Sequence, residues 1–279
     1  MTASADSMSA TGSSPVRIAI SPTRLLGIGL LILLGLAALL GPEPFGLDPA
    51  GQSLRDSLQG PNTIYWLGTD HLGRDMAARL LSGARLSLSL AVLSVITAAI
   101  PGVAFGLFAV FGGPWADRLL GIFADAVLAL PGLLLVLMLA AIAPGSWWAL
   151  YVGISLTLWV EYFRYTRQRT RILVASPAVE AARLLGFGSI HILRRHIAPE
   201  LTPGLLTIAA FGMATAVTAM AALGFVSVGL RPPTAEWGIM MTELLPYWRE
   251  APWLILQPVA CLVVTVLSLH LAIGIGKRP

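Results

Sequence analysis

Charged residues are scarce in this chain of 279 amino acids: Asp, Glu, Lys and Arg together make up 11% of it, whereas 56% is apolar. A soluble domain of this length needs far more charge to cover its surface. The composition therefore excludes a soluble globular protein and indicates an integral membrane protein. The formal net charge of +4 is small and the positive excess is local, so a nucleic-acid-binding protein is excluded as well.

Cysteine and the motifs of catalysis are also lacking. The single Cys261 excludes a disulfide framework and a Cys-based metal cluster, and the four histidines form no H-E-x-x-H pair. No G-x-x-x-x-G-K-[ST] motif is present, so ATP and Mg²⁺ are not expected to bind this chain. No His–Asp or Ser–Lys pair occurs at helical spacing in the apolar runs, which argues against a membrane-embedded hydrolase. We expect no catalytic residue, no metal site and no cofactor in this chain.

Six apolar runs approach or exceed the roughly 20 residues that cross a bilayer core as a helix. They cover residues 25–41, 86–111, 119–142, 147–163, 204–230 and 254–275. The pattern predicts an all-α polytopic membrane protein with six transmembrane helices. A cleaved signal peptide is the alternative for the first run, but no clean A-x-A site follows it.

The predicted organisation has four parts. Residues 1–23 form a disordered tail, 24–41 the first transmembrane helix and 42–85 an outer segment rich in Pro and Gly; residues 86–279 form a five-helix core. The core contains a polar segment, residues 164–203.

The distribution of Lys and Arg predicts the orientation. Twelve of the eighteen fall on the side that holds the N-terminus and six on the other, which also carries eight of the fourteen acids. Because positive residues concentrate in cytoplasmic segments, both termini and the polar segment are expected in the cytoplasm. Six tryptophans fall at predicted outer ends and are interpreted as anchors in the membrane interface: Trp66, Trp147, Trp148, Trp237, Trp248 and Trp253.

The polar segment 164–203 holds seven of the eighteen Lys and Arg residues. Ser176 is a favourable N-cap and Pro177 fits a first helical turn, where the charge of Glu180 complements the helix dipole. Gly186 is expected to break this helix in a sharp turn.

A second helix is predicted over residues 189–198, ending at Pro199. The segment is therefore expected to be a helix-turn-helix outside the bilayer.

Part of this segment matches a known motif, carried by Glu180, Ala181, Ala182, Gly186, His196 and Pro199. It resembles the EAA loop of binding-protein-dependent ABC importer permeases, in the variant of the peptide/nickel branch. Residues 66–75 and 229–238 are similar to segments of the C-type permeases of that branch. The resemblance covers most of the chain in the right order.

The resemblance implies that the loop is a coupling helix that inserts into a cleft on an ATP-binding subunit. It implies as partners two ATP-binding subunits, which bind ATP and Mg²⁺, a second permease that is a different chain, an extracytoplasmic substrate-binding protein and membrane lipid. The implied location is the bacterial cytoplasmic membrane. The implied cargo is a di- or oligopeptide, with nickel or a metal–metallophore chelate as the alternative.

A secondary transporter is a remote alternative, because it needs titratable residues near the bilayer midplane and few are present. Asp125 and Glu161 do lie in apolar runs, where an ionised carboxylate is costly without a partner or water. Pairing with Arg164 or Arg118 is the favoured interpretation. The other is that both carboxylates line a translocation path.

Overall fold

The computed structural model of this chain describes residues 21–273. Most of the predicted tail, both termini and the end of the last predicted span lie outside the described residues. Within them the regular structure is helical, apart from an isolated bridge between Thr69 and Asp75. The helices are α1 (Pro22–Leu40), α2 (Met76–Phe111), α3 (Gly113–Leu128), α4 (Gly132–Ile142), α5 (Trp147–Val174), α6 (Pro177–Leu184), α7 (Ser189–Ile192), α8 (Ala198–Phe225), α9 (Trp237–Leu244) and α10 (Pro252–Ile273). Short 3₁₀ turns occupy Glu43–Phe45, Leu54–Asp56 and Leu245–Tyr247, and a π turn occupies Leu193–Ile197.

Four described helices are long and apolar enough to cross a membrane: α1, α2, α10 and the continuous helix Ser189–Phe225. The bent pair α3 and α4 makes a fifth. α5 is long enough at 28 residues, but its polar and charged side chains keep it out of this apolar set. The all-α polytopic class is thus confirmed, while the count of six spans stays a prediction.

The third predicted span, residues 119–142, is not one straight helix. α3 and α4 meet at a break and are bent by 74°. Pro131 is the N-cap of α4, and the residue before a proline is disfavoured in the α-helical conformation. This break could not be predicted from the sequence, because apolar residues continue through both flanking helices.

Two other predicted boundaries were wrong. α2 begins at Met76, ten residues before the predicted start, because Asp75 is its N-cap: Oδ1 accepts the N–H groups of Ala77 at 2.7 Å and Ala78 at 3.2 Å. The run 204–230 is helical only as far as Phe225.

The second helix of the polar segment does not end at Pro199, as predicted, but continues into α8. The N–H of Ala198 donates to the carbonyl of Leu193, five residues back, in a π turn. This wider turn displaces the carbonyls that a proline ring would otherwise strike. Pro199 directly follows this turn, as the second residue of α8.

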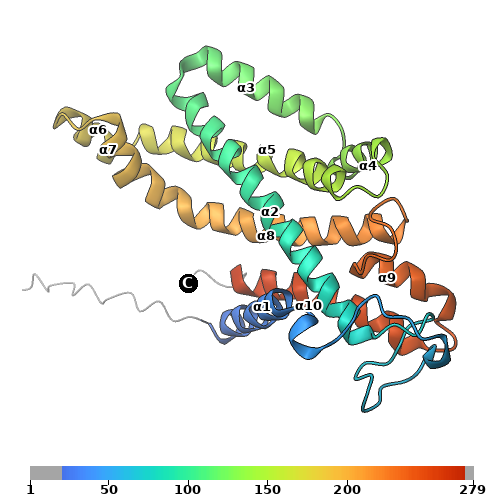
Figure 1. Cartoon of the computed structure of the whole chain (residues 1–279). Coiled ribbons are helices and arrows are strands. Elements are labelled where there is room, and N and C mark those ends of the chain that lie inside the picture. Colours follow the sequence, from blue (N-terminus) through green and yellow to red (C-terminus); the bar gives the residue numbers. More distant parts are fainter. Residues whose placement is uncertain (1–20, 274–279) are drawn as a thin grey trace, which may run out of the picture.

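The core is built on a close crossing of α2 with α5, helped by two glycines one turn apart. A Cβ at Gly102 would lie 2.6 Å from the carbonyl oxygen of Trp159, and a Cβ at Gly106 2.6 Å from Cβ of Thr166. Only glycine lets the two backbones approach this closely, as in the small-xxx-small pattern of membrane helices. Figure 1 shows α2 running across both α5 and α8.

The two ends of the molecule are built from different elements (Figure 1). The loop with α6 and α7 lies at one end, and α9 lies with the segment 41–75 at the opposite end. α1 packs beside α10, where Gly27 meets Leu271 and Ala272. Arg85 of α2 donates to the carbonyls of Ala38 and Leu40, so it satisfies the last turn of α1 and ties that helix to the core.

Gly102→Ala is expected to destabilise the chain by roughly 1–3 kcal/mol, because the new methyl group meets backbone that cannot move aside. Gly35→Ala on α1 is the matched control, since nothing lies within 4 Å of a Cβ there. Thermal unfolding in detergent measures both. Equal midpoints for the two variants would contradict the proposed crossing.

Candidate functional site

The loop between α5 and α8 is built as the sequence predicts up to its turn. Ser176 is the N-cap residue of α6, although its side chain makes no capping hydrogen bond, and Pro177 and Glu180 lie in the first turn. Gly186 has φ +82° with open space around it. Glycine is therefore required at this position by backbone conformation, which confirms the predicted glycine turn.

The loop has an inner face that fixes it to the rest of the molecule. Ala182 is buried at 5% exposure, and with Val179 it packs against Ile192, Ile197 and Leu201. Ala182 therefore holds α6 against the start of α8 and is not available to a partner.

The outer face carries most of the other predicted coupling residues. Glu180, Ala181, Gly186 and Pro199 are exposed, whereas His196 is half-buried beside the π turn. The structure thus places these four residues on the surface of one loop and separates them from Ala182.

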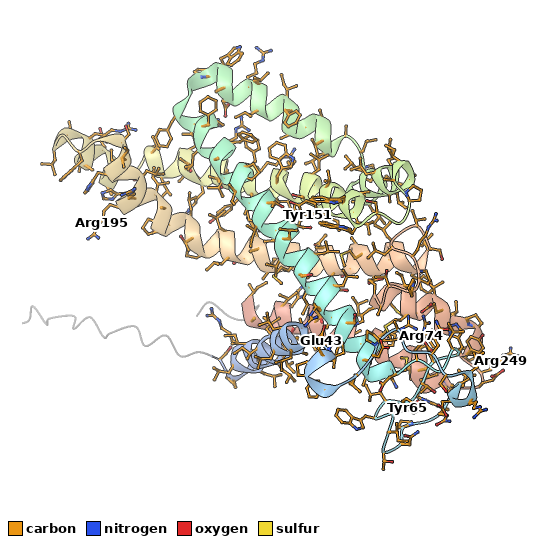
Figure 2. All side chains as sticks on the ribbon, in the orientation of Figure 1. Glu43, Tyr65, Arg74, Tyr151, Arg195 and Arg249 are labelled. Atoms are coloured by element: carbon orange, nitrogen blue, oxygen red, sulfur yellow. The ribbon has the colours of Figure 1, made fainter. Side chains whose placement is uncertain are left out.

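The end of the loop exposes large apolar side chains, here called the apolar tip. Leu184, Leu185 and Ile190 are 84%, 76% and 70% exposed, and Phe187 stacks on His191 at 4.4 Å between ring centroids. Exposed arginines flank the tip, including Arg195, which Figure 2 labels at this end of the molecule. Exposed apolar groups rimmed by charge are typical of a protein–protein interface.

Every arginine of α5 has a carboxylate partner. The pairs are Arg164–Asp125 at 2.7 Å, Arg167–Asp117 at 2.5 Å, Arg171–Asp117 at 2.8 Å and Arg169–Glu200 at 3.2 Å. The favoured interpretation of Asp125, pairing with Arg164, is thus confirmed. Asp125 is 72% exposed and does not line the cavity described next.

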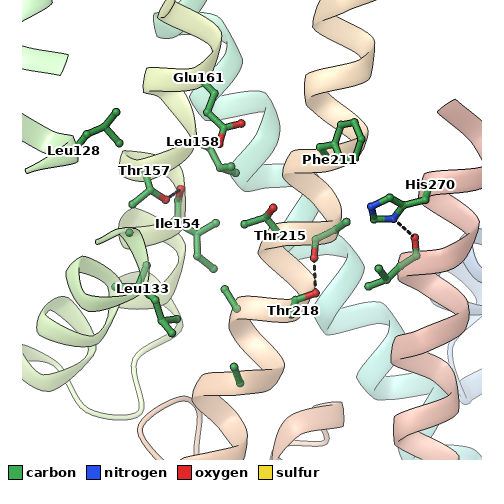
Figure 3. A pocket seen from close by; sticks show the side chains of 16 residues that line it. Leu128, Leu133, Ile154, Thr157, Leu158, Glu161, Phe211, Thr215, Thr218 and His270 are labelled. Carbon is green, nitrogen blue, oxygen red and sulfur yellow. Dashed lines mark hydrogen bonds between the residues drawn. The ribbon is translucent and has the colours of Figure 1, made fainter. Parts of the chain in front are cut away.

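A cavity of about 560 Å³ lies between α4, α5, α8 and α10. Most of its lining is apolar, with Glu161, His270 and a few threonines as the polar exceptions. Figure 3 shows Glu161 on α5 and His270 on α10 on different sides of this space, with Phe211 and Thr215 of α8 beside it. No Lys or Arg lies within 4 Å of the Glu161 carboxylate among residues 21–273. Sequence analysis gives Asp125 and Glu161 the same two interpretations. In the structure they differ, because Asp125 pairs with Arg164 whereas Glu161 lines the cavity.

Comparison with known proteins identifies the family. The model of the family described as "binding-protein-dependent transport system inner membrane component" matches residues 102–276. The chain belongs to this family.

Relatives of this permease carry names that refer to peptides. It is 34% identical to the di/tripeptide transport system permease protein of Pseudomonas aeruginosa, over 90% of this chain and 85% of that protein. It is 32% identical to a dipeptide transport system permease protein of Alkalihalophilus pseudofirmus, over 96% and 90%. A glutathione transport system permease protein of Pectobacterium atrosepticum is 32% identical over 79% of this chain and 73% of its own length.

Solved structures show the same fold. A chain of the inward-facing MetNI methionine ABC transporter aligns with a TM-score of 0.57 and 18% identity, covering 70% of this permease and 92% of that chain. The permease is therefore a multi-pass inner membrane protein with the helical fold of an ABC importer subunit.

The end opposite the loop holds a buried ion cluster that sequence analysis missed. Arg74 Nε donates to Asp70 Oδ2 at 2.6 Å, Arg74 Nη2 to Glu243 at 3.1 Å, and Arg79 contacts both carboxylates. Asp70, Arg74 and Arg79 are fully buried. Figure 2 labels Arg74 at this end. The cluster joins the outer segment and α2 to α9, over 160 residues later, a distance that leaves no local signal in the sequence.

Burial and the charged neighbours of Asp70 shift the pKa of its carboxyl group in opposite directions. Burial alone raises the pKa of Asp70, but the backbone N–H of Arg74 and the guanidinium groups of Arg79 and Arg74 outweigh burial and lower this pKa. Asp70 therefore stays ionised, and the cluster keeps its charges paired.

Trp237 is not an interface anchor, which corrects one sequence-based interpretation. It is fully buried, lies over Gly83, and donates from Nε1 to the carbonyl of Leu80 at 3.3 Å. The neighbouring Glu236 is 2% exposed. It caps α9 by accepting the N–H of Ile239 with one oxygen, while the other oxygen has no partner among the described residues.

Arg79→Gln is expected to destabilise the permease by about 3–5 kcal/mol, because it leaves buried carboxylates without their partner. Asp125→Asn, which breaks an exposed pair, is expected to cost no more than about 1 kcal/mol. Thermal unfolding of the purified chain compares the two. A midpoint for Arg79→Gln equal to that of Asp125→Asn would contradict the burial of the cluster.

Glu236 predicts a pH dependence of stability. Burial raises the pKa of Glu236 from 4.5 to about 7, so the folded state holds a proton that the unfolded state releases. The contribution of Glu236 to the free energy of unfolding is then highest below pH 4.5, falls as the pH rises toward 7, and is constant above, a loss of roughly 3 kcal/mol. Glu236→Gln is expected to flatten this part of the curve. Identical pH profiles for wild type and variant would show that Glu236 does not contribute.

Proposed function

We propose that this permease is one of two membrane subunits of an ATP-driven importer and that its α5–α8 loop docks on the ATP-binding subunits. The apolar tip carries this proposal, since Leu184, Leu185 and Ile190 are the most exposed large apolar residues of a loop that is otherwise anchored. Glu180, Ala181, Gly186 and Pro199 lie on the same loop surface, with His196 beside the π turn. Gly186 permits close approach of the partner, because its surroundings are open.

The packing of α5 and α8 gives the loop a mechanical connection to the cavity. Next to the loop, the two helices touch where Gly204 lies against the side chain of Tyr165, and a Cβ at position 204 would collide with that ring. Further along, both helices line the cavity. A push on the anchored loop therefore moves two cavity walls together, which is the displacement that alternating access requires.

We assign di- or oligopeptides as the cargo, with the cavity as this chain's part of the path. Relatives named for peptides support this assignment, and a cavity of about 560 Å³ is of the size that binds small molecules. Nickel or a metal chelate is the alternative that ligand identification on the binding protein tests.

The remaining partners follow from the family. ATP and Mg²⁺ bind the two ATP-binding subunits, the second permease is a different chain, and both termini and the loop are cytoplasmic. The outer segment meets the extracytoplasmic binding protein, consistent with the exposure of Ile64 and Trp66 at its surface.

Gly186→Ala is expected to weaken coupling by about 5- to 30-fold, because a side chain at φ +82° costs roughly 1–2 kcal/mol. Gly188→Ala is the matched control: it is two residues away and equally open, but its φ is −73°. Peptide-stimulated ATP hydrolysis by the assembled complex and pull-down of the ATP-binding subunit measure the effect. Gly186→Asp adds a negative charge as well as backbone strain, and it is expected to abolish binding of the ATP-binding subunit. Full binding and coupling in that variant would count against docking through the loop.

The assembled complex in vesicles is expected to take up a dipeptide only when its binding protein and ATP are both present. Radiolabelled peptide trapped inside the vesicles is the measurement. Uptake that persists without ATP would favour a secondary transporter instead, and ATP-driven uptake of nickel but not peptide would select the alternative cargo.

A further inference from the structure

The cavity between α4, α5, α8 and α10 has hydrogen-bond acceptors fixed at several points of its lining. Thr157 donates its hydroxyl to the carbonyl of Ile154 at 2.8 Å, and Thr218 donates to that of Ala214 at 2.8 Å. Both hydroxyl oxygens therefore offer only acceptor positions to the cavity.

His270 adds another acceptor. Its Nδ1 lies 2.7 Å from the carbonyl oxygen of Val266, which can only accept, so Nδ1 carries a proton. In the neutral ring, Nε2 is then an acceptor. The His270 ring also makes an edge-to-face contact with the ring of Phe211, with the two centroids 5.2 Å apart.

Among the described residues that line the cavity, Glu161 is the only acid and none is Lys or Arg. The arginine nearest to it along α5, Arg164, is engaged by Asp125. An ionised carboxylate inside an apolar span is costly without a cation. The cavity thus combines a negative charge with acceptor groups and lacks a positive charge to balance them.

We propose that Glu161 forms a subsite for an ammonium group in this cavity and that the occupant is the positively charged amino group of the transported peptide. An ammonium group has three N–H donors and no acceptor, which matches this lining. This inference rests on the proposed function for its occupant, but the preference of the cavity for cations is a property of the described residues alone.

The charge preference can be measured with a cysteine in the cavity. Thr215 is exposed to the cavity and its hydroxyl makes no hydrogen bond to another described residue, so Thr215→Cys is a mild change. Cys261 is the chain's single native cysteine and is removed as Cys261→Ala. The assembled complex is treated with methanethiosulfonate reagents that carry either a trimethylammonium or a sulfonate group, and the rates of labelling are compared. Complex with Cys261→Ala alone gives the background from the other subunits.

We expect the cationic reagent to label position 215 about tenfold faster than the anionic one, and the ratio to fall to about one when Glu161→Gln is added. Glu43→Gln, which removes an exposed acid far from the cavity lining, should leave the ratio unchanged. Equal rates with Glu161 present, a ratio insensitive to Glu161→Gln, or no labelling by either reagent would each overturn the subsite.

Uptake by the same complex tests the occupant. Glu161→Gln should lower peptide uptake at least about fivefold and Glu161→Asp should restore most of it, while both variants still assemble with the ATP-binding subunits. Unchanged uptake in Glu161→Gln, or loss of complex assembly, overturns the assignment, since the second result means that Glu161 pairs with a partner subunit. A cation preference without any ATP-driven peptide uptake by wild type would refute the proposed function and leave the cation site standing.

Discussion

The close approach of α2 and α5 at Gly102 and Gly106 is the constraint on which the rest of the structure depends. With no hydrophobic drive between helices inside lipid, close backbone packing supplies much of the association energy. This crossing fixes α5, and α5 in turn carries the paired arginines, one wall of the cavity and the start of the α5–α8 loop. A shift of α5 away from α2 would alter the loop and the cavity at the same time.

α5 and α8 together connect the loop at one end of the molecule with the cavity. A π turn beneath the loop leads into α8, which passes the cavity at Phe211 and Thr215 before it reaches the end opposite the loop. There Gly224 lies against Glu236, next to the ion cluster that Arg74 and Arg79 form with α9. The proposed function needs a rigid connection between the α5–α8 loop and the cavity, and two long helices packed side by side supply it.

Much of this could be predicted from sequence because apolar runs and a local motif carry the information. The all-α class, the α6 helix and the turn at Gly186 depend on residues close in sequence. The break before Pro131 was hidden because apolar sequence continues on both sides, and Pro199 misled because a π turn accommodates it. Sequence alone could not tell that Asp125 pairs with Arg164 whereas Glu161 has no Lys or Arg partner among residues 21–273, since that difference depends on how α3 and α5 pack. The pairing of Arg79 with Glu243 likewise has no local signature.

The central claim is that the apolar tip of the loop contacts the ATP-binding subunit. A photoreactive benzoylphenylalanine at Leu184, which is 84% exposed, tests it directly in the assembled complex. The same residue at Leu39 of α1, which is 79% exposed but far from the loop along the chain, is the control. The account predicts that irradiation crosslinks the ATP-binding subunit to position 184 and not to position 39. Absence of that crosslink at 184, or equal crosslinking at both positions, would contradict it.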